Sequence, residues 1–316
     1  MMSNKTIDVV VVGELNMDLI MNGAQAFPQV GKEIIAANMD LTLGSSSAIF
    51  ASNLSSLGSR VSFAGKIGDD LFGRMTLDSL QRQNVVTDMV IEVPSLRTGA
   101  TVILNYGNDR ANVTYLGAME QLELSDLPVE KFSSAKHLHV ASCFLQKGLK
   151  KDIATLFRTV REYGLTTSLD PQWDPEENWD LDLGEVLPLV DIFLPNEREL
   201  LNLTKQNNVE SALDMVAAYG NITAVKRGLK GSIVSSPAGR CAMAAFVNDR
   251  VVDAIGAGDS FDAAFIHEFI RQRDMEACQR FANLIAAIST TAAGGTGAFA
   301  DIHYKIENAR SLYGFH

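Results

Sequence analysis

The chain has 316 residues, a length that suits one large α/β domain burying about three quarters of its unfolded surface. Hydrophobic residues make up 47% and Pro counts only 8, a composition that argues against long disordered tracts. The formal net charge of -11 disfavours nucleic acid or an anionic membrane as the main ligand.

The cysteines and the N-terminal stretch bear on the compartment of the protein. Cys143, Cys241 and Cys278 are odd in number and lack metal-ligand spacing, which argues against a disulfide framework or a zinc site and predicts buried thiols. The apolar run at residues 7–12 is too short for a signal peptide or a membrane span. We therefore expect a cytoplasmic protein.

The first predicted strand is Ile7–Val12, a β-branched run that suits a parallel strand buried on both faces. It ends at Gly13, and the following residues lack the G-x-G-x-x-G spacing of a dinucleotide-binding unit, so that class is disfavoured. Asn16 and Asp18 lie two positions apart, so an extended backbone places both side chains on one face, where they could hold a polyol.

Two stretches predict a small separate sheet. Residues 17–43 carry short apolar alternation, and residues 97–116 predict a hairpin with its turn at Gly107-Asn108-Asp109. Together they could form a lid over a site. Between them, residues 44–58 start small and polar and continue with apolar residues at helical spacing, which predicts a buried helix capped by Ser45 or Ser46.

The middle of the chain alternates between strands and helices. Strands are predicted at 136–141, 166–170, 191–194 and 222–226, and helices at 150–163, 197–204 and 209–219. This alternation is typical of an α/β fold with a mostly parallel sheet and helices on both faces. No linker or internal repeat interrupts it, so residues 1–316 are expected to form a single domain that carries the lid of about 17–43 and 97–116.

Asp170 lies at the end of a predicted strand, at the edge where open α/β sheets place their sites. It could therefore face a substrate or a metal ion. A turn before Pro171 explains the same residue equally well, so both interpretations stay open.

The stretch 251–265 predicts a strand-like run that turns through Gly256, Ala257 and Gly258 into a helix. Unpaired N–H groups in the first turn of a helix stabilise phosphate oxygens. A carboxylate beside them is electrostatically unfavourable, which suggests that Asp259 has the task of accepting a proton from an attacking hydroxyl. A capped helix after a tight connection is the alternative interpretation.

The stretch 253–259, DAIGAGD, resembles the D-T-x-G-A-G-D signature of the ribokinase-like (phosphofructokinase B) carbohydrate kinases, with Ala254 in place of Thr. The resemblance covers nearly the whole chain. It implies a ribokinase-like fold with a β lid, Asp259 as catalytic base, and an anion hole formed by the backbone of Gly256, Ala257 and Gly258. It also implies that a homodimer could form through the lid.

The family's first signature, G-G-x-x-x-N followed by a helix, is matched only in part. Gly44 matches its first Gly, Ser45 replaces the second, and Ile49 stands where the family Asn contacts the sugar. We expect Asn16, Asp18 and Gly44 to hold the acceptor. The departure at Ile49 makes ribose itself a poor candidate.

The resemblance also implies a nucleotide and metal side of the site. Asn196 and Glu199 match an N-x-x-E motif that helps to hold magnesium and phosphates through water. Residues 226–231 match the nucleotide loop, usually T-x-G-x-x-G, with Lys226 in place of Thr and with Gly228 and Gly231 retained. Lys226 could supply positive charge to a phosphate.

Two further ligand contacts follow from the same resemblance. Asn283, on a helix predicted to begin at Met275, matches a position near the adenine. Asp253 and the loop 292–298 match the site of a monovalent cation such as K⁺. The expected ligands are therefore ATP, Mg²⁺ and a small sugar, with a monovalent cation as a further candidate.

The resulting expectation is an ATP-dependent kinase that phosphorylates a hydroxyl of a small sugar or sugar derivative, with Asp259 as general base. A nucleoside kinase of the same fold fits the same motifs. A sugar-sensing relative that binds without phosphorylating is the third hypothesis, and Asp259 argues against it because binding alone needs no base. Neither a nucleic acid nor a membrane is expected as a partner.

Overall fold

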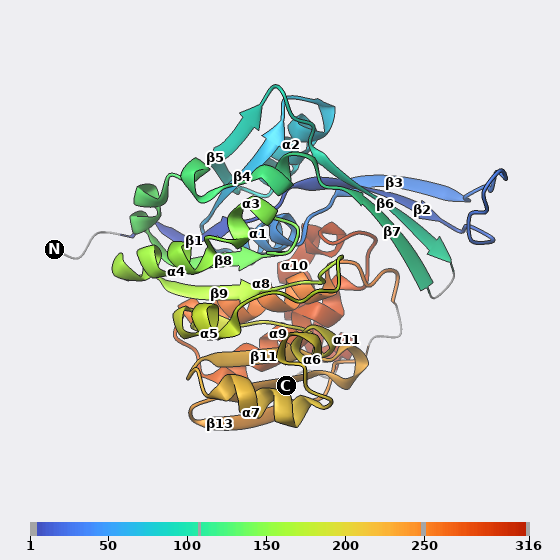
Figure 1. Ribbon diagram of the computed structural model, residues 1–316. Coiled ribbons are helices and arrows are strands. Elements are labelled where there is room, and N and C mark those ends of the chain that lie inside the picture. The colour runs from blue at the N-terminus through green and yellow to red at the C-terminus, as the bar shows by residue number, and fades with distance from the viewer. Residues whose placement is uncertain (1–4, 107–108, 248–250, 314–316) are drawn as a thin grey trace.

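The computed structural model describes residues 5–106, 109–247 and 251–313 (Figure 1). Within these residues a nine-stranded sheet runs in the order β13-β12-β11-β10-β9-β8-β1-β4-β5. Its pairs are parallel from β11 to β5 and antiparallel from β11 to β13. In chain order, the strands are β1 (Ile7–Val12), β4 (Val61–Gly68), β5 (Val86–Val93), β8 (Ala135–Ala141), β9 (Thr166–Asp170), β10 (Ile192–Phe193), β11 (Ile222–Lys226), β12 (Ser232–Ser236) and β13 (Gly239–Met243).

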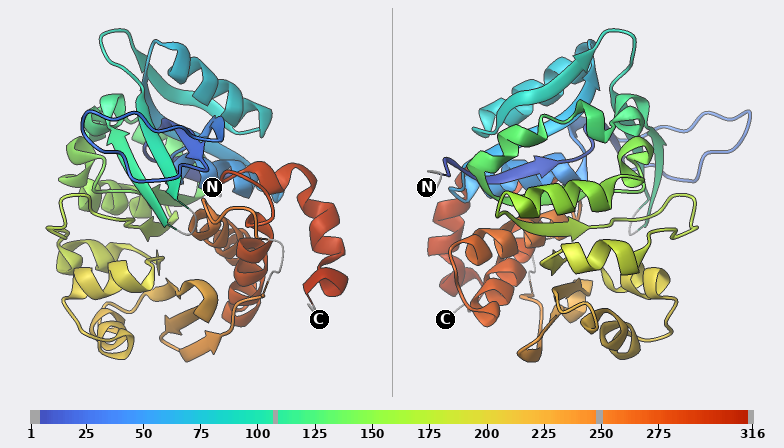
Figure 2. Two further views of the ribbon diagram at one scale, coloured as in Figure 1. Left: turned by 90° about the vertical axis from the view of Figure 1, so that its right-hand side faces the viewer. Right: turned by 60° about the vertical axis from the view of Figure 1, so that its left-hand side comes forward.

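Helices cover both faces of this sheet (Figure 2). Side chains of β1 alternate between two cores, because Val10 and Val12 belong to one apolar cluster while Val9 and Val11 belong to the other. The first cluster is covered by α3 (Lys147–Lys150), α4 (Ile153–Glu162), α5 (Leu183–Val186), α6 (Glu197–Thr204) and α7 (Val209–Ala217). The second is covered by α1 (Ser46–Ser56), α2 (Leu71–Arg82), α8 (Ala257–Ile270), α9 (Met275–Ser289), α10 (Ile302–Glu307) and α11 (Ala309–Tyr313). The predicted α/β architecture is confirmed.

Several predicted elements have different bounds in the structure. The helix expected at 150–163 corresponds to α4, which begins only at Ile153 because the backbone of Asp152 is not helical; Lys150 is the last residue of the separate helix α3. The strand-like run before Gly256 is not a strand: Val251 and Val252 are exposed, and the N–H group of Val252 donates to the carbonyl of Thr290 beyond α9. A β-branched run therefore needs a partner strand before its propensity decides the structure.

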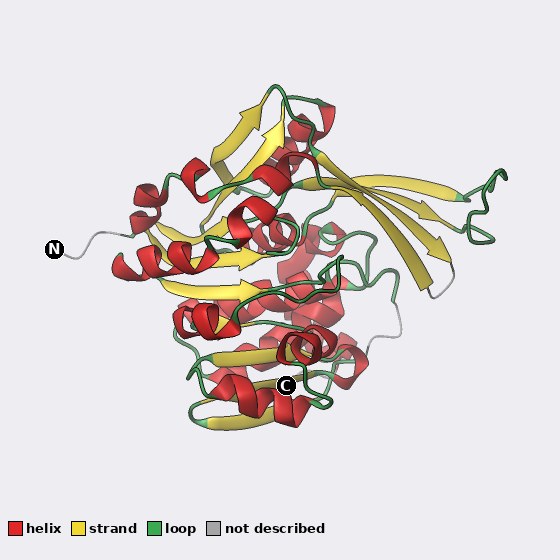
Figure 3. Ribbon diagram, in the orientation of Figure 1, coloured by secondary structure: helices red, strands yellow, loops and turns green. Residues whose placement is uncertain are grey.

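The two segments predicted as a lid pair in one four-stranded sheet, in the order β3-β2-β6-β7 (Figure 3). Its strands are β2 (Asn16–Asn22), β3 (Asn38–Leu43), β6 (Gly99–Tyr106) and β7 (Asp109–Tyr115). The arms of the predicted hairpin are thus confirmed, and its turn at 107–108 lies outside the described residues. This four-stranded sheet is called the lid below. Its closing over a site stays a prediction.

Two expectations about chemistry outside the site can be compared with the structure. Cys143 and Cys278 are buried as predicted, but Cys241 is exposed because it lies on the edge strand β13. No helix in the described part of the chain is long and apolar enough to cross a membrane.

Candidate active site

Polar side chains meet at the carboxyl edge of the parallel strands. Glu14 follows β1, Asp170 ends β9 and Lys226 ends β11. Parallel strands place these ends at one edge of the sheet. The first turn of α8 reaches the same edge, since the side chain of Gln172, just after β9, donates from Nε2 to Oδ1 of Asp259 at 3.1 Å.

Asp259 is a buried carboxylate with two hydrogen-bond donors. The hydroxyl of Ser46 and the amide of Gln172 both donate to its Oδ1 atom. Burial raises the pKa of Asp259 to about 7, against the opposing hydrogen bond from Ser46. A carboxylate that titrates near neutral pH is suited to accept a proton from a hydroxyl.

The loop before α8 is built for close backbone approach. Gly256 has a left-handed backbone with φ of 74°, and a Cβ atom there would lie 2.6 Å from Cα of Gly295. Gly258 differs from the expectation, because it lies within the helix and a Cβ there would make only ordinary contact with Lys226, 3.7 Å away. Within the described residues, the N–H groups of Gly258 and Asp259 have no hydrogen-bond partner, so they are available to an anion.

The three predicted acceptor residues come together at the base of the lid. Asn16 donates from Nδ2 to Oδ1 of Asp18 at 2.9 Å and to Oγ1 of Thr101 at 3.0 Å. The N–H group of Gly44 donates to the carbonyl of Asn16 at 3.1 Å. Burial raises the pKa of Asp18 to about 6. These groups offer carboxylate, amide and hydroxyl functions to the hydroxyls of a polyol.

The two departures from the first signature have structural reasons. Ser45 takes a left-handed backbone with φ of 68°, which Gly adopts without cost, and its hydroxyl accepts from the N–H of Ala48 at 3.0 Å as the cap of α1. Ile49 is buried against the loops at Gly256 and Gly295: a Cβ on Gly295 would lie 2.4 Å from its Cδ1 atom. Ile49 therefore fills the space between α1 and the anion loop.

Lys226 is held between two buried carboxylates. Its Nζ atom lies 2.9 Å from Oδ2 of Asp170 and 2.7 Å from Oδ2 of Asp262. Burial by itself would raise the pKa of Asp170, but Lys226 holds that pKa below its usual value. Lys226, which was predicted to contact the nucleotide, thus already has two partners within the protein.

The predicted magnesium residues are bonded to each other. The Asn196 side chain accepts from the N–H of Glu199 at 2.9 Å, and the carboxylate of Glu199 accepts from the N–H of Asn196 at 2.8 Å. This is a capping box at the start of α6. Burial, with Asp170 nearby, raises the pKa of Glu199 to about 8. In the described residues, no three His, Cys, Asp or Glu side chains are grouped to hold a metal ion. The roles of Asn196, Glu199 and Asp253 at a metal ion stay predictions.

The remaining predicted positions lie on separate elements. Gly228 and Gly231 both have left-handed backbones, and a Cβ on Gly231 would lie 2.0 Å from the carbonyl oxygen of Met243. Asn283 is buried on α9, and its Nδ2 atom has no hydrogen-bond partner among the described residues. Asp253 accepts from the N–H of Gly294 at 3.0 Å, which ties it to the predicted cation loop.

Sequence reasoning missed four polar side chains of this edge, namely Glu14, Ser46, Gln172 and Asp262. A signal existed for Asp262, which follows Asp259 by three residues and so shares its helix face. The signal for Ser46 was the run of serines at the start of α1. Gln172 offered none, because only the folded chain brings it to Asp259.

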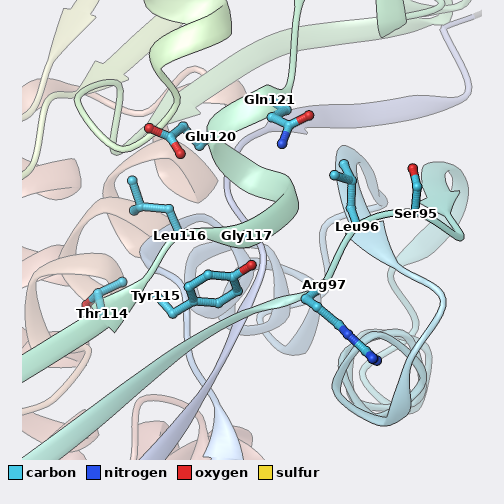
Figure 4. A pocket seen from close by; sticks show the side chains of 9 residues that line it. All are labelled: Ser95, Leu96, Arg97, Thr114, Tyr115, Leu116, Gly117, Glu120 and Gln121. Atoms are coloured by element: carbon cyan, nitrogen blue, oxygen red, sulfur yellow. The ribbon is translucent and has the colours of Figure 1, made fainter.

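A cavity of about 290 Å³ lies apart from these residues, where β6 and β7 meet the body of the protein (Figure 4). The cavity contains none of the predicted site residues. Its lining includes Arg97 before β6 and Tyr115 at the end of β7, whose side chains are drawn in Figure 4. It is not part of the candidate active site.

The family model described as "pfkB family carbohydrate kinase" matches residues 6–301. The chain belongs to the pfkB family of carbohydrate kinases. This confirms the resemblance carried by the DAIGAGD stretch and the enzyme class.

Individual relatives agree with this family. An uncharacterized sugar kinase of Archaeoglobus fulgidus is 29% identical over 74% of this chain and 92% of its own length. An ATP-dependent ribose-1-phosphate kinase of Halopiger xanaduensis is 28% identical over 92% of this chain and 94% of its own. The structure of Arabidopsis thaliana ribokinase, complexed with ribose and ATP, is 25% identical, with a TM-score of 0.79 over 91% of this chain and 94% of that one. The predicted ribokinase-like fold is thereby confirmed.

Proposed function

We propose that this pfkB-family enzyme transfers the γ-phosphoryl group of ATP to a hydroxyl of a small sugar or sugar derivative. The observation that carries the proposal is the position of Asp259, a buried carboxylate at the start of α8 beside two N–H groups that have no partner in the described part of the chain. The Asn16, Asp18 and Gly44 cluster at the same edge supports a polyol as acceptor.

The proposed reaction uses these groups in one step. Asp259 takes the proton of the acceptor hydroxyl, and the oxygen of that hydroxyl attacks the γ-phosphorus of ATP. The bond between the γ-phosphorus and the oxygen of the leaving ADP breaks in the same step. The N–H groups of Gly258 and Asp259, at the positive end of α8, stabilise the oxygens of the transferring group. The general base contributes roughly a hundredfold to ten-thousandfold to such a step.

The nucleotide is expected to enter as the magnesium complex of ATP. The buried amide of Asn283, which lacks a partner in the described chain, suits an acceptor atom of the adenine. Gly228 and Gly231 would allow backbone approach to the phosphates. Asn196 and Glu199 would act on magnesium through water only, because each already bonds the other.

Three finer statements belong to this proposal. The tie between Asp253 and Gly294 supports a monovalent cation such as K⁺ in that loop. The outer face of the lid exposes Met39, Leu41 and Val113, which supports a homodimer formed through this sheet. An enzyme that consumes ATP is expected in the cytoplasm.

The test is ADP release from ATP and magnesium across neutral sugars, sugar acids, sugar phosphates and nucleosides, with and without K⁺. Turnover on one acceptor, lost in Asp259→Asn with folding intact, is the expected result. Preference for nucleosides would favour the alternative nucleoside kinase. Calorimetric binding of a sugar without any ADP release would favour the non-catalytic sensor, and an undiminished rate in Asp259→Asn would remove the base from the mechanism.

A further inference from the structure

A chain of polar contacts connects three elements around the proposed base. Asp262 on α8 pairs with Lys226 at the end of β11, and Lys226 pairs with Asp170 at the end of β9. Oδ2 of Asp170 then accepts from Nε2 of Gln172 at 2.7 Å, and the same Nε2 atom donates to Oδ1 of Asp259 at 3.1 Å. Lys226 is therefore connected to the carboxylate of Asp259 by three successive hydrogen bonds, through Asp170 and Gln172.

Lys226 also lies directly against the start of α8. A Cβ atom on Gly258 would be 3.8 Å from its Nζ atom, and the Lys226 side chain is only 11% exposed. The carboxylates of Asp170 and Asp262 take two of the three directions in which an ammonium group can donate. This geometry suits a fixed internal charge better than a mobile side chain that reaches out to the nucleotide.

The charges around Asp259 explain why such a fixed cation is needed. Acidic groups face it from several elements, and like charges at short range in a buried site oppose ionisation. Among the residues that the structure describes, Lys226 is the cation paired with two of these acids, Asp170 and Asp262. The titratable and charged groups that act on Asp259 or on its partners are Glu14, His139, Asp170, Glu199, Lys226 and Asp262.

We propose that Lys226 is a positioning residue for phosphoryl transfer, which holds Asp170 so that Gln172 stays aimed at Asp259 and which keeps the Asp259 carboxylate ionised. The proposal rests on the role of Asp259 in the proposed function. It gives Lys226 a task that the usual Thr at this position of the nucleotide loop cannot perform, because Thr carries no charge.

The first test is the pH dependence of kcat/KM in Lys226→Met, which keeps the length of the side chain and removes its charge. The acidic limb is expected to move upward by about one pH unit, with a roughly tenfold loss at pH 6 and little change in KM for ATP. A raised KM for ATP with an unmoved limb would instead make Lys226 a nucleotide ligand and overturn the proposal.

A second variant is needed in case Lys226→Met does not fold, since removing one member of a buried ion pair is strongly destabilising. Asp262→Asn keeps the pair of Lys226 with Asp170 and removes one negative charge, so the acidic limb should move to lower pH. Lys151→Met, at an exposed cation that follows α3 and lies outside the nucleotide loop, should leave the limb in place. Movement of the Lys226 and Asp262 variants in the same direction, or no movement in Asp262→Asn, would contradict the proposal.

A failure of the proposed function can be distinguished from a failure of this role of Lys226. If the wild-type enzyme phosphorylates no acceptor in the panel, the titration of Asp259 can still be followed by infrared spectroscopy of protein labelled with ¹³C-aspartate, with Asp259→Asn as the subtraction reference. A midpoint that rises in Lys226→Met, or falls in Asp262→Asn where the first variant does not fold, would support the role of Lys226. An unchanged midpoint in Asp262→Asn would overturn it whatever the substrate.

Discussion

Gly44 and Asp18 approach so closely that a Cβ atom on Gly44 would lie 2.2 Å from Oδ1 of Asp18. Gly44→Ala is therefore expected to displace the Asp18 carboxylate and to raise the KM of the acceptor by about tenfold or more, because each lost hydrogen bond to a charged group is worth about 1.5–3 kcal/mol. Steady-state kinetics with the acceptor varied at saturating ATP measures the effect.

The matched control is Gly184→Ala in α5, which is not part of the acceptor cluster; the nearest atom to a new Cβ there is Oδ1 of Asp182 at 3.3 Å. Its acceptor KM should stay at the wild-type value. Equal values of KM in Gly44→Ala and the wild type would mean that Asp18 does not bind the acceptor, and the assignment of this cluster would have to be abandoned.

The buried acids also predict how stability depends on pH. The folded-state pKa is raised to about 6 in Asp18, to about 7 in Asp259 and to about 8 in Glu199. For a carboxyl group whose pKa is raised by folding, the folded state holds the proton longer than the unfolded state does, so stability falls as pH rises through this range. The free energy of unfolding without ligands should therefore decrease by on the order of 7 kcal/mol between pH 5 and 8.

Urea denaturation at several pH values measures this decrease. Glu199→Gln, which cannot ionise, should make it smaller, particularly above pH 6. A wild-type stability that is constant or rises from pH 5 to 8 would show that these carboxyl groups are ionised in the folded protein without penalty.

Ser45 predicts a difference between two substitutions at one position. Its left-handed backbone costs about 1 kcal/mol for a residue with a Cβ, while its hydroxyl caps α1 and donates to the carbonyl of Glu14 at 2.5 Å. Ser45→Ala loses both hydrogen bonds and keeps the strain, so a loss of about 2 kcal/mol is expected. Ser45→Gly loses the same bonds but relieves the strain, so its loss should be about 1 kcal/mol.

Thermal or chemical denaturation of the two variants measures this difference, and each variant serves as the control for the other. If Ser45→Ala is as stable as Ser45→Gly, the left-handed conformation is not strained. The usual Gly of the family signature would then serve close approach to a ligand at this position rather than backbone freedom.

These examples show what the sequence could and could not predict. The apolar run of β1 was sufficient to predict a strand buried on both faces, and the alternation of strands with helices along the chain was sufficient to predict the parallel sheet. The pairing of Lys226 with Asp170 and Asp262 could not be predicted, because it depends on the order β9-β10-β11 in the sheet and on the rotation of α8 above it. Motifs locate residues along the chain, but the partners of a buried charge are fixed by packing.

The apolar contact between the lid and the anion loop carries the last prediction. Ile20 of β2 and Ile103 of β6 are buried together with Ile255, which immediately precedes Gly256. Closing the lid therefore buries apolar surface directly on the loop that would bind the phosphoryl group. This contact is expected to favour the closed lid and to couple binding of the acceptor to the order of the anion loop.

Ile103→Ala removes part of this contact and should shift the lid toward the open form. We expect a severalfold increase in the KM of the acceptor and a higher rate of ATP hydrolysis without acceptor, because an open site admits water to the phosphoryl group. Ile35→Ala, the same change at an exposed position in the loop between β2 and β3, should alter neither value. Wild-type kinetics in Ile103→Ala would mean that the polar contacts of Asn16 and Asp18 hold the lid by themselves.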